Sequence, residues 1–356
     1  MSDTLTLIVP GDPAQRTGGY LYDHHIVEEL RHAGRKVRVL GLSGRFPLAD
    51  SGAARAMDAA LSERPDGAAV VIDGLALGAV PDAVARHAAR LDLSALVHHP
   101  LADETGLDPA LQRQLLDSER RALALCRRII VTSAFTARRL QALGLSERTP
   151  AVVEPGVATA ALAPVANARL NEQPEPAEEQ LLCVASLTPR KGQDVLLAAL
   201  AGLEASNWRC RLSGSDQRDP AFAARLAAQL QALALGGRLE LTGERDPLSL
   251  EADYAWATVC VLPSHYEGYG MVVSEALARG LPVISTTGGA LADTLPDGAG
   301  LKVAPNDVGQ LRAALERWLS EPQLRRDLTR AAVGLRAQLP SWADSARLFA
   351  AALERP

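Results

Sequence analysis

The chain has 356 residues, 47% of them hydrophobic and 22% charged, with a formal net charge of −5 at pH 7. This length exceeds a single typical core, and the composition excludes a disordered chain, so two globular domains are expected. The acidic balance argues against a nucleic-acid-binding protein, which would be basic overall.

Short apolar runs alternate with longer helical patterns through the first half of the chain. The expected strands are 5–9, 37–40, 69–72, 95–97, 129–132 and 151–153. Helical patterns lie between them, for example at 20–33, 81–90 and 109–125. Such alternation is typical of parallel α/β architecture.

A second series of the same kind follows. Its expected strands are 181–185, 209–212, 239–242, 258–262 and 283–285, with helices that include 194–201, 221–233, 248–254 and 271–278. The segment between the two series, 155–179, is rich in Ala, Pro and Glu and indicates a linker, with a hinge near 160–178. The chain ends in an amphipathic helix whose apolar residues are Trp342, Ala346, Leu348, Phe349 and Leu353.

These patterns predict two consecutive doubly wound, Rossmann-like domains. Residues 1–165 form the first domain, 166–338 the second, and 339–356 a C-terminal helix that packs back across the junction. Ligands bind outside the carboxyl ends of the strands in such sheets, so a cleft between facing domains is the expected site.

The cysteines and the N-terminus point to a cytoplasmic protein. Cys126, Cys183, Cys210 and Cys260 lie far apart without a CxxC pair, which favours reduced thiols over disulfides or a zinc site. The first residues lack a basic signal-peptide region, and no run of 18 apolar residues occurs. Peripheral contact with the cytoplasmic membrane face stays open as an alternative.

The most informative segment begins where the strand 258–262 ends. Glu267 and Glu275 flank Gly268 and Gly270, and a helix pattern starts at Met271. A glycine-rich turn from strand to helix directs free amides and the positive helix end toward an anion, ideally a phosphate. An ordinary turn with two solvated glutamates is the competing interpretation.

Two further groups follow strands. Arg190 and Lys191 come after the first strand of the second domain, where two cations would neutralise a diphosphate, although solvated surface charges have the same appearance. Gly18 and Gly19 precede the first helix, in a loop that would allow close backbone approach to a ligand, or in a structural turn. No G-x-G-x-x-G occurs there, which argues against a dinucleotide oxidoreductase.

The sequence resembles a known family. Glu267-x7-Glu275 within PSHYEGYGMVVSEALARGLPVISTTGGALAD is similar to the E-x7-E segment of retaining glycosyltransferases of family four, which have the GT-B fold. The similarity continues through VASLTPRKGQDVLLAAL (184–200), VTSAFTARRL (131–140), VVEPGV (152–157) and Gly18-Gly19. It implies a hexosyltransferase that uses a nucleotide-diphosphate sugar and needs no other cofactor.

The resemblance also implies roles for individual residues. Glu267 matches the glutamate beside the donor-sugar hydroxyls, and Glu275 matches the one that binds the ribose. Lys191 matches a ligand of the donor phosphates. The other donor-binding positions it implies are Gly18, Gly19, Ser186, Arg190, Gly243, Glu244, Gly268, Tyr269, Gly270, Met271 and Val272.

One position departs from the family pattern, and one stays ambiguous. Many relatives have Gly-Arg where this chain has Ala185-Ser186, so Arg190 is assigned part of the missing charge. The resemblance places a histidine at the site after the fourth strand, and His98 is preferred over His99. The catalytic set is therefore His98, Arg190, Lys191 and Glu267, with His99 and Glu104 as weaker acceptor-side candidates.

The sequence predicts that no metal takes part. No Asp-x-Asp occurs, and enzymes that hold a diphosphate through a metal commonly need such acidic ligands. The acceptor is expected to carry a hydroxyl on a small molecule, a glycan or a lipid. Two alternatives remain: a nucleotide-sugar epimerase or hydrolase of the same fold, and a catalytically silent subunit that binds a partner.

Overall fold

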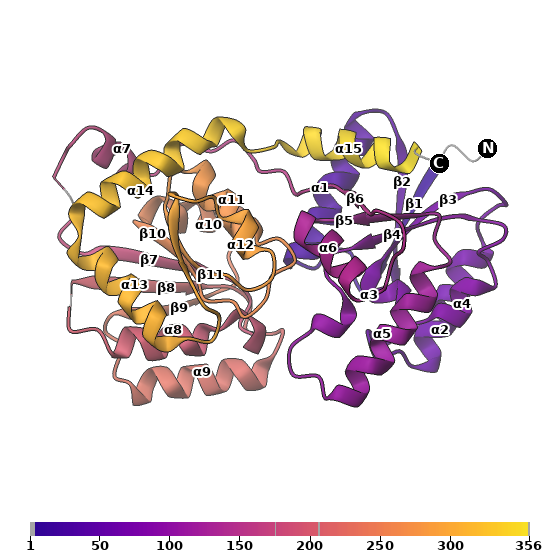
Figure 1. The fold of residues 1–356 in the computed structure, drawn as a ribbon, viewed down its shortest axis with the longest axis horizontal. Helices are drawn as coiled ribbons and strands as arrows, with labels where there is room; N and C mark the ends of the chain where they lie inside the picture. The colour runs from indigo at the N-terminus through magenta and orange to yellow at the C-terminus, as the bar shows by residue number, and fades with distance from the viewer. Residues whose placement is uncertain (1–3, 175, 206, 355–356) are drawn as a thin grey trace. The chain divides into compact units, whose positions relative to one another are not determined.

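The chain folds into two compact units. The computed structural model describes residues 4–174, 176–205 and 207–354. The first unit contains the chain up to Gly156 together with the chain from Pro340 onward, and the second runs from Val157 to Leu339 (Figure 1). The boundary therefore precedes the expected one at 165/166, and the C-terminal helix is part of the first unit instead of a separate segment.

The first unit contains a sheet of six parallel strands in the order β2-β1-β3-β4-β5-β6. The strands are β1 (Thr4–Pro10), β2 (Lys36–Leu42), β3 (Ala69–Asp73), β4 (Asp92–Val97), β5 (Arg128–Val131) and β6 (Ala151–Val152). Because all six strands are parallel, their carboxyl ends lie at one edge of the sheet.

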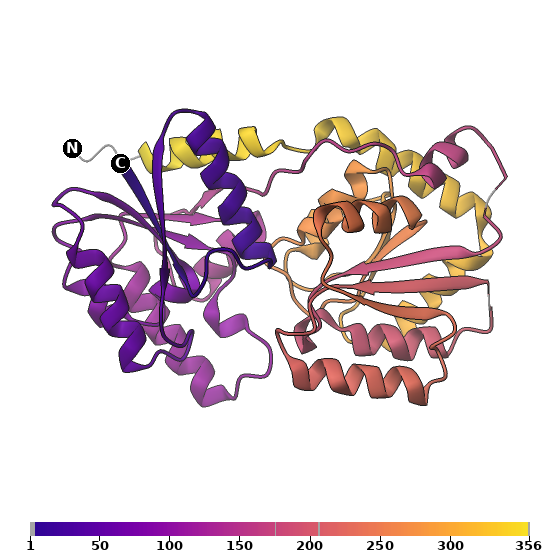
Figure 2. The same ribbon diagram turned by 180° about the vertical axis from the view of Figure 1, so that it is seen from behind.

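Helices cover both faces of this sheet. They are α1 (Gly18–His32), α2 (Ser51–Ser62), α3 (Gly74–Leu77), α4 (Pro81–Ala85), α5 (Pro109–Leu123), α6 (Ala134–Ala142) and α15 (Trp342–Glu354), with one 3₁₀ turn, η1 (Leu101–Asp103). Ile8 packs with α2 to α5 on one face, while its neighbour Leu7 faces α1 and α15 on the other. Figure 2 shows helices on both sides of this sheet. Strands buried on both faces explain the continuous apolar runs in the sequence.

Helix α15 returns to the first unit and packs on α1. The Trp342 indole stacks on His25, with ring centroids 4.4 Å apart, and the Ser345 hydroxyl donates to the Glu154 carbonyl at 2.7 Å. A Cβ at Gly156 would lie 2.3 Å from the Trp342 amide nitrogen, so the chain passes closely where it leaves and re-enters the unit. Leu348, expected on the apolar face, is 55% exposed because it lies on the solvent side of the helix.

The second unit repeats the architecture with the strand order β12-β11-β10-β7-β8-β9, again all parallel. Its strands are β7 (Glu179–Val184), β8 (Trp208–Ser213), β9 (Leu239–Gly243), β10 (Val259–Leu262), β11 (Val283–Thr286) and β12 (Gly300–Val303). The edge strand β12 is absent from the predicted series because its short sequence, Gly-Leu-Lys-Val, has little apolar signal.

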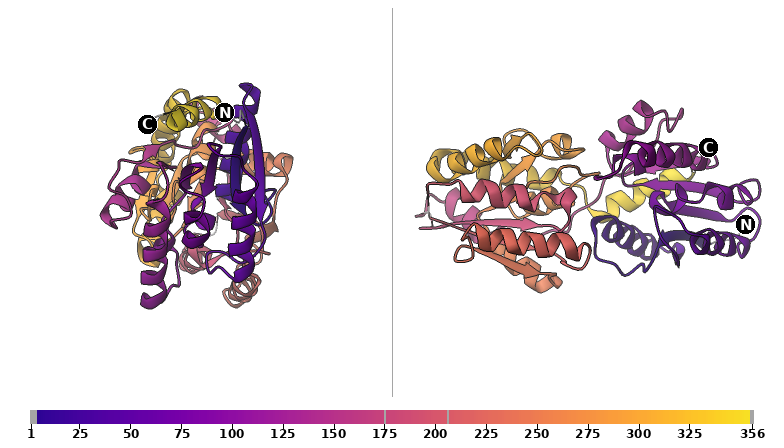
Figure 3. Two further views of the ribbon diagram at one scale, coloured as in Figure 1. Left: turned by 90° about the vertical axis from the view of Figure 1, so that its right-hand side faces the viewer. Right: turned by 90° about the horizontal axis from the view of Figure 1, so that it is seen from below.

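The helices of this unit are α7 (Pro164–Leu170), α8 (Gln193–Ala201), α9 (Pro220–Ala232), α10 (Pro247–Trp256), α11 (Met271–Ala278), α12 (Leu291–Thr294), α13 (Val308–Ser320) and α14 (Pro322–Leu335). Two 3₁₀ turns, η2 (Pro189–Lys191) and η3 (Arg336–Gln338), complete the set. Along β7, Leu181 and Cys183 pack with α8, α9 and α13, whereas Leu182 packs with α10 and α11. Figure 3 shows the helices on both sides of the sheet.

The expected linker is part of the second unit. The segment contains α7, whose Ala166 is fully buried, and the Ala163 amide donates to the Arg279 carbonyl at 2.9 Å. Within the same unit, the guanidinium of Arg336 contacts the Ala160 carbonyl. Small alanines pack closely here without a helical hydrophobic period, and for that reason the segment resembled a linker in sequence.

The helix expected at 81–90 is shorter than predicted and ends at Ala85. No helix in the described part of the chain is long and apolar enough to cross a bilayer.

A buried ionic network stabilises the second unit. The Glu179 carboxylate, 4% exposed, accepts from Arg169 at 3.0 Å, from Thr258 at 2.6 Å and from Trp318 at 2.9 Å, and Arg325 lies at 3.3 Å. Replacing Glu179 with Ala would leave buried guanidinium groups without a counter-charge. We expect the free energy of unfolding to fall by about 3–5 kcal/mol in urea titrations.

The neighbouring Glu178 is the matched control. It pairs with Arg209 at 2.9 Å at the surface, where both side chains are about half exposed. Glu178→Ala should cost less than about 1 kcal/mol. Equal losses in the two variants would contradict a stabilising role for the buried network.

Candidate active site

The backbone of Glu267 is held in the loop between β10 and α11. The Glu267 amide donates to the Gly288 carbonyl at 3.3 Å, and the Ala290 amide donates to the Glu267 carbonyl at 2.8 Å. A Cβ at Gly289, whose φ is +65°, would lie 2.3 Å from the Glu267 carbonyl oxygen. The Gly288-Gly289 pair therefore allows the loop after β11 to approach Glu267, a role that the sequence analysis missed.

The loop that carries Arg190 and Lys191 is fixed against the same segment. The Arg190 carbonyl accepts from the His265 amide at 2.8 Å. Gly192 has φ +64°, and a Cβ there would lie only 2.2 Å from the Pro263 carbonyl oxygen. This turn brings both cations beside Glu267, as expected when two parallel strands end at one edge of a sheet.

Three side chains hold the Glu267 carboxylate. Lys191 Nζ lies 2.6 Å from Oε1, the Ser264 hydroxyl donates to the same oxygen at 2.7 Å, and Arg190 lies 3.4 Å from Oε2. Arg190 also donates to the Tyr266 carbonyl at 2.9 Å. Ser264 precedes Glu267 by three residues in the same loop, but nothing in the sequence marked it as a partner.

The charges of this cluster follow from burial and pairing. Burial would raise the pKa of Glu267, but the neighbouring Lys191 and Arg190 cations lower it to about 2. Burial lowers the pKa of Lys191, an effect that Glu267 opposes. Two cations face one carboxylate, so the cluster carries an excess positive charge suited to an anionic ligand.

The turn into α11 has the geometry of an anion site. Gly270 precedes the helix with φ +91°, and a Cβ there would lie 2.5 Å from Leu291 Cδ2. The Tyr269 carbonyl accepts from the Thr294 hydroxyl at 2.7 Å, which fixes the turn from the other side. The first amides of α11, including those of Met271 and Val272, have no carbonyl partner within the helix and carry its positive dipole.

Glu275 lies in α11 in a different environment. The Tyr254 hydroxyl donates to its Oε2 at 2.6 Å, and the Arg279 guanidinium lies over the Tyr254 ring at 4.3 Å. Burial raises the pKa of Glu275, while the hydrogen bond from Tyr254 opposes this effect. No hydrogen bond to Oε1 is found among the residues described, so one carboxylate oxygen is available to a ligand hydroxyl.

The remaining predicted positions lie at the carboxyl ends of neighbouring strands. Ser186 follows β7, and its carbonyl accepts from Gln193 Nε2 at 3.0 Å. Gly243 ends β9 with φ +73° and accepts from the Gly214 amide at 2.9 Å, whereas Glu244 is exposed.

Near this edge the sequence analysis missed Asp253, a buried carboxylate on α10. It accepts from Ser213 at 2.8 Å, from Arg211 at 3.1 Å and from Arg245 at 2.8 Å. Its helix pattern gave no signal because a buried acid is identified only by the partners that surround it.

In the first unit, Gly18 and Gly19 are helical. They form the first turn of α1 after Thr17, and the predicted pre-helix loop is wrong at these two positions because both have helical backbone geometry. A Cβ at Gly19 would lie 3.3 Å from His98 Cδ2, so the absent side chain makes room for the histidine ring. At Gly18 a Cβ would meet nothing within 4 Å.

The two adjacent histidines have different surroundings. His98 Nε2 lies 3.3 Å from Asp23 and 3.4 Å from Asp73, whereas His99 Nε2 lies 3.5 Å from Glu104. Asp23 and Asp73 are functional candidates that the sequence analysis missed. Two signals were present: Asp23 follows Gly19 by one helical turn, and Asp73 ends a buried strand.

Two doubly wound parallel sheets, with a cationic cluster and an amide-rich turn at the strand ends of the second, are the arrangement found in the GT-B class of glycosyltransferases. Residues 167–333 match the model of the family described as glycosyl transferases group 1. The resemblance to family-four glycosyltransferases is thereby confirmed.

Individual relatives agree with this assignment. D-inositol 3-phosphate glycosyltransferase from Nocardioides sp. is 35% identical over 214 residues, covering 55% of this chain and 46% of that protein. The chain thus spans about half the length of the curated relatives it matches. Sucrose-phosphate synthase from Thermosynechococcus elongatus has a TM-score of 0.79 at 25% identity, covering 98% of this chain and 100% of that one. HepE from Anabaena, solved with UDP-glucose, has a TM-score of 0.74 at 17% identity, with 98% and 99% covered.

Stability should respond to pH through Glu267. Its folded-state pKa of about 2 lies below the ordinary value of 4.5, so the stability it contributes is present above pH 4.5 and is lost as pH falls toward 2. The stability advantage of the wild type over Glu267→Gln should shrink by about 2 kcal/mol between pH 6 and pH 3 in denaturant titrations. Glu275→Gln is the control with the opposite sign, because the pKa of Glu275 is raised. The same trend in both variants would contradict the assigned ion pairing.

The close contact at Gly192 should be sensitive to a single methyl group. Gly192→Ala places a Cβ against Pro263 and strains a positive φ, so the free energy of unfolding should fall by about 2–3 kcal/mol. Gly298→Ala is the matched control, since Gly298 has φ +82° and open space around it. Its cost should be limited to the backbone strain of about 1 kcal/mol. Equal costs by thermal unfolding would show that the Pro263 contact is unimportant.

Proposed function

We propose that this chain transfers a sugar from a nucleotide-diphosphate sugar to an acceptor hydroxyl, with retention of the anomeric configuration and without a metal. The observation that carries the proposal is the convergence of Arg190 and Lys191 on Glu267 beside the start of α11. Cations and free amides at one strand edge are suited to a diphosphate. A carboxylate among them is suited to sugar hydroxyls.

The cluster suggests how the donor is received. Without a ligand, Lys191 and Arg190 are paired with Glu267. A bound diphosphate offers these cations stronger oxygen partners, and the Glu267 carboxylate then accepts hydrogen bonds from the sugar. Because its pKa is about 2, Glu267 stays ionised and is a poor base, so it positions the sugar and takes no proton.

The other end of the donor fits Glu275. Tyr254 occupies one oxygen of this carboxylate and orients it, and the second oxygen is free to accept from the ribose hydroxyls. The relatives support a donor of this kind, since HepE was solved with UDP-glucose and the Nocardioides protein is named a glycosyltransferase.

Retention is proposed to occur by front-face displacement. The bond from the anomeric carbon to the diphosphate oxygen breaks while the acceptor oxygen bonds to the same face of that carbon. The departing diphosphate oxygen takes the proton of the acceptor hydroxyl, and its charge is stabilised by Lys191, Arg190 and the first amides of α11. Glu267, held by three donors, is a poor nucleophile, which argues against a covalent glycosyl intermediate.

Donor binding tests this assignment. A thermal-shift screen with UDP-, GDP-, ADP- and dTDP-sugars identifies the donor, and calorimetry then measures its Kd. Lys191→Ala and Glu275→Ala should each weaken binding about 10- to 100-fold, since each removes a hydrogen bond to or from a charged group. Lys302→Ala and Glu316→Ala, which alter surface residues of the same unit, should bind as the wild type does.

The reaction itself distinguishes the alternatives. The anomeric proton of the product, followed by NMR in the presence of EDTA, should show retention and undiminished turnover. Donor breakdown without any acceptor would favour the hydrolase alternative. Unchanged donor affinity in both site variants would contradict the proposed donor site.

A further inference from the structure

His98 lies between two carboxylates, and neither carboxylate has a role in the reaction proposed above. It follows β4, Asp73 ends the neighbouring strand β3, and Asp23 lies one turn into α1. Nε2 is 3.3 Å from Asp23 Oδ1 and 3.4 Å from Asp73 Oδ2. A single ring nitrogen thus faces two acid groups from two different elements.

Burial makes two carboxylates beside His98 costly unless the histidine ring carries a second proton and is positively charged. The side chains of Asp23 and Asp73 are 8% and 9% exposed, and that of His98 is 19% exposed. Neither Asp23 Oδ1 nor His98 Nε2 has a well-directed hydrogen bond to any described residue, so they satisfy each other only through charge. Two desolvated carboxylates beside a neutral ring would have no cation to offset their repulsion.

The ring is held in one orientation. The edge of His98 that includes Cδ2 and Nε2 faces Gly19, and Tyr22 packs edge-on at 5.5 Å between centroids. The His98 carbonyl is within hydrogen-bond distance of the hydroxyls of Thr132 and Thr136, at 3.3 and 3.4 Å. No hydrogen bond to Nδ1 is found in the described part of the chain. Nδ1 therefore lies on the opposite edge, available to a ligand.

We propose that Asp23 and Asp73 are positioning residues that keep both nitrogens of His98 protonated, so that His98 presents Nδ1–H as a cationic donor to a substrate oxygen. The role toward substrate rests on the function proposed above, whereas the protonation state does not. His98 then acts as a hydrogen-bond donor to a hydroxyl or phosphate oxygen. It cannot serve as the base that deprotonates the acceptor, because it is already protonated at neutral pH.

The electrostatics support this assignment. Burial alone would lower the pKa of His98, but the two carboxylates raise it to about 10. Burial raises the pKa of Asp23, and His98 opposes that effect. The nearby Tyr22 is neutral, because burial raises its pKa well above 10 and its hydroxyl donates to the Val153 carbonyl at 3.0 Å.

The other elements packed here add no competing charge to the ring. The hydroxyls of Thr132, which follows β5, and of Thr136, on α6, face the His98 carbonyl, and Trp342 of α15 contacts Tyr22. His25 is stacked on Trp342, and burial lowers its pKa, so it is neutral at pH 7.

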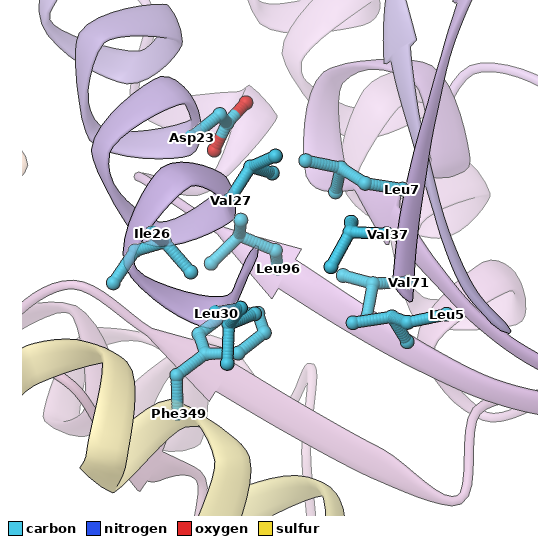
Figure 4. A pocket seen from close by; sticks show the side chains of 10 residues that line it. All are labelled: Leu5, Leu7, Asp23, Ile26, Val27, Leu30, Val37, Val71, Leu96 and Phe349. Carbon is cyan, nitrogen blue, oxygen red and sulfur yellow. The ribbon is translucent and has the colours of Figure 1, made fainter. Parts of the chain in front are cut away.

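The cavity below Asp23 limits where a ligand can approach. Figure 4 shows Asp23 at one end of a space otherwise lined by aliphatic side chains and Phe349. The space has room for about one water molecule, so no sugar or phosphate enters there. A ligand therefore does not reach this cluster through that space.

A metal ion is the competing occupant of this cluster. One ligand atom from each of Asp23, Asp73 and His98 lies within 4.8 Å of the others, which is close enough for a shared divalent cation. A metal would replace the proton on Nε2. The two alternatives therefore predict opposite protonation of the same nitrogen.

Nitrogen NMR of the full chain labelled with ¹⁵N-histidine distinguishes them. Comparison with His98→Gln assigns the His98 signals. In the wild type both His98 nitrogens should keep the shifts of a protonated ring from pH 6 to pH 8.5. Asp73→Asn should lower the midpoint of the His98 titration by at least one pH unit, so that the loss of the proton becomes measurable. Asp23→Asn replaces this variant if Asp73→Asn folds poorly.

Asp58→Asn is the matched control. Asp58 pairs with a different histidine, His87, at 2.8 Å, and its replacement should leave the His98 signals unchanged. A wild-type His98 that titrates near pH 6.5 would overturn the proposal. So would bound zinc in stoichiometric amount whose removal by chelation moves the His98 signals.

Activity provides a separate readout once the donor is known. In Asp73→Asn, kcat/KM should decline as pH rises through the new midpoint, because the ring then loses its proton, while the wild type stays flat. Donor Kd measured at pH 6 should change little. A chain that transfers no sugar would contradict the proposed function and would leave the NMR result to decide the protonation of His98.

Discussion

The second unit depends on one buried interaction, the Glu267 carboxylate held by Lys191, Arg190 and Ser264. Its residues come from two loops that follow different strands, and backbone hydrogen bonds join those loops to each other and to the Gly288-Gly289 turn. The carboxylate keeps two cations together in a buried place where they would otherwise repel each other. The free protein therefore already has the charge arrangement that a diphosphate sugar would need, with Glu267 in the place of the anion.

The first unit contains a similar buried cluster whose net charge has the opposite sign. There Asp23 and Asp73 surround a single histidine, and the excess charge is negative. In both units the ionisable groups gather at strand ends or at the start of a helix, where backbone no longer fills the space. Both clusters lie where ligands bind in this architecture, whereas the buried Glu179 network of the second unit lies at the start of β7.

Glycine positions show how closely the loops approach. At Gly192 and Gly289 a Cβ would overlap the backbone of a neighbouring loop, at Gly270 it would overlap the Leu291 side chain of α12, and all three have positive φ. Each of them separates a charged residue or a helix start from a second loop. A larger residue would force these neighbours apart, so these glycines control the geometry of the charged groups.

By itself the sequence determined the order of strands and helices, the family resemblance, and the choice of Glu267 and of Lys191 as separate site candidates, because these depend on local periodicity and on short motifs. The strand and helix series agree closely with the structure, apart from β12, the shortened helix at 81–85 and the helix inside the expected linker. Only the tertiary structure decided which distant groups meet. Examples of such pairs are Asp23 with His98, Tyr254 with Glu275, and Asp253 with Arg245. A parallel sheet brings together strand ends that are far apart in the chain, and no local pattern records that proximity or the burial of these groups.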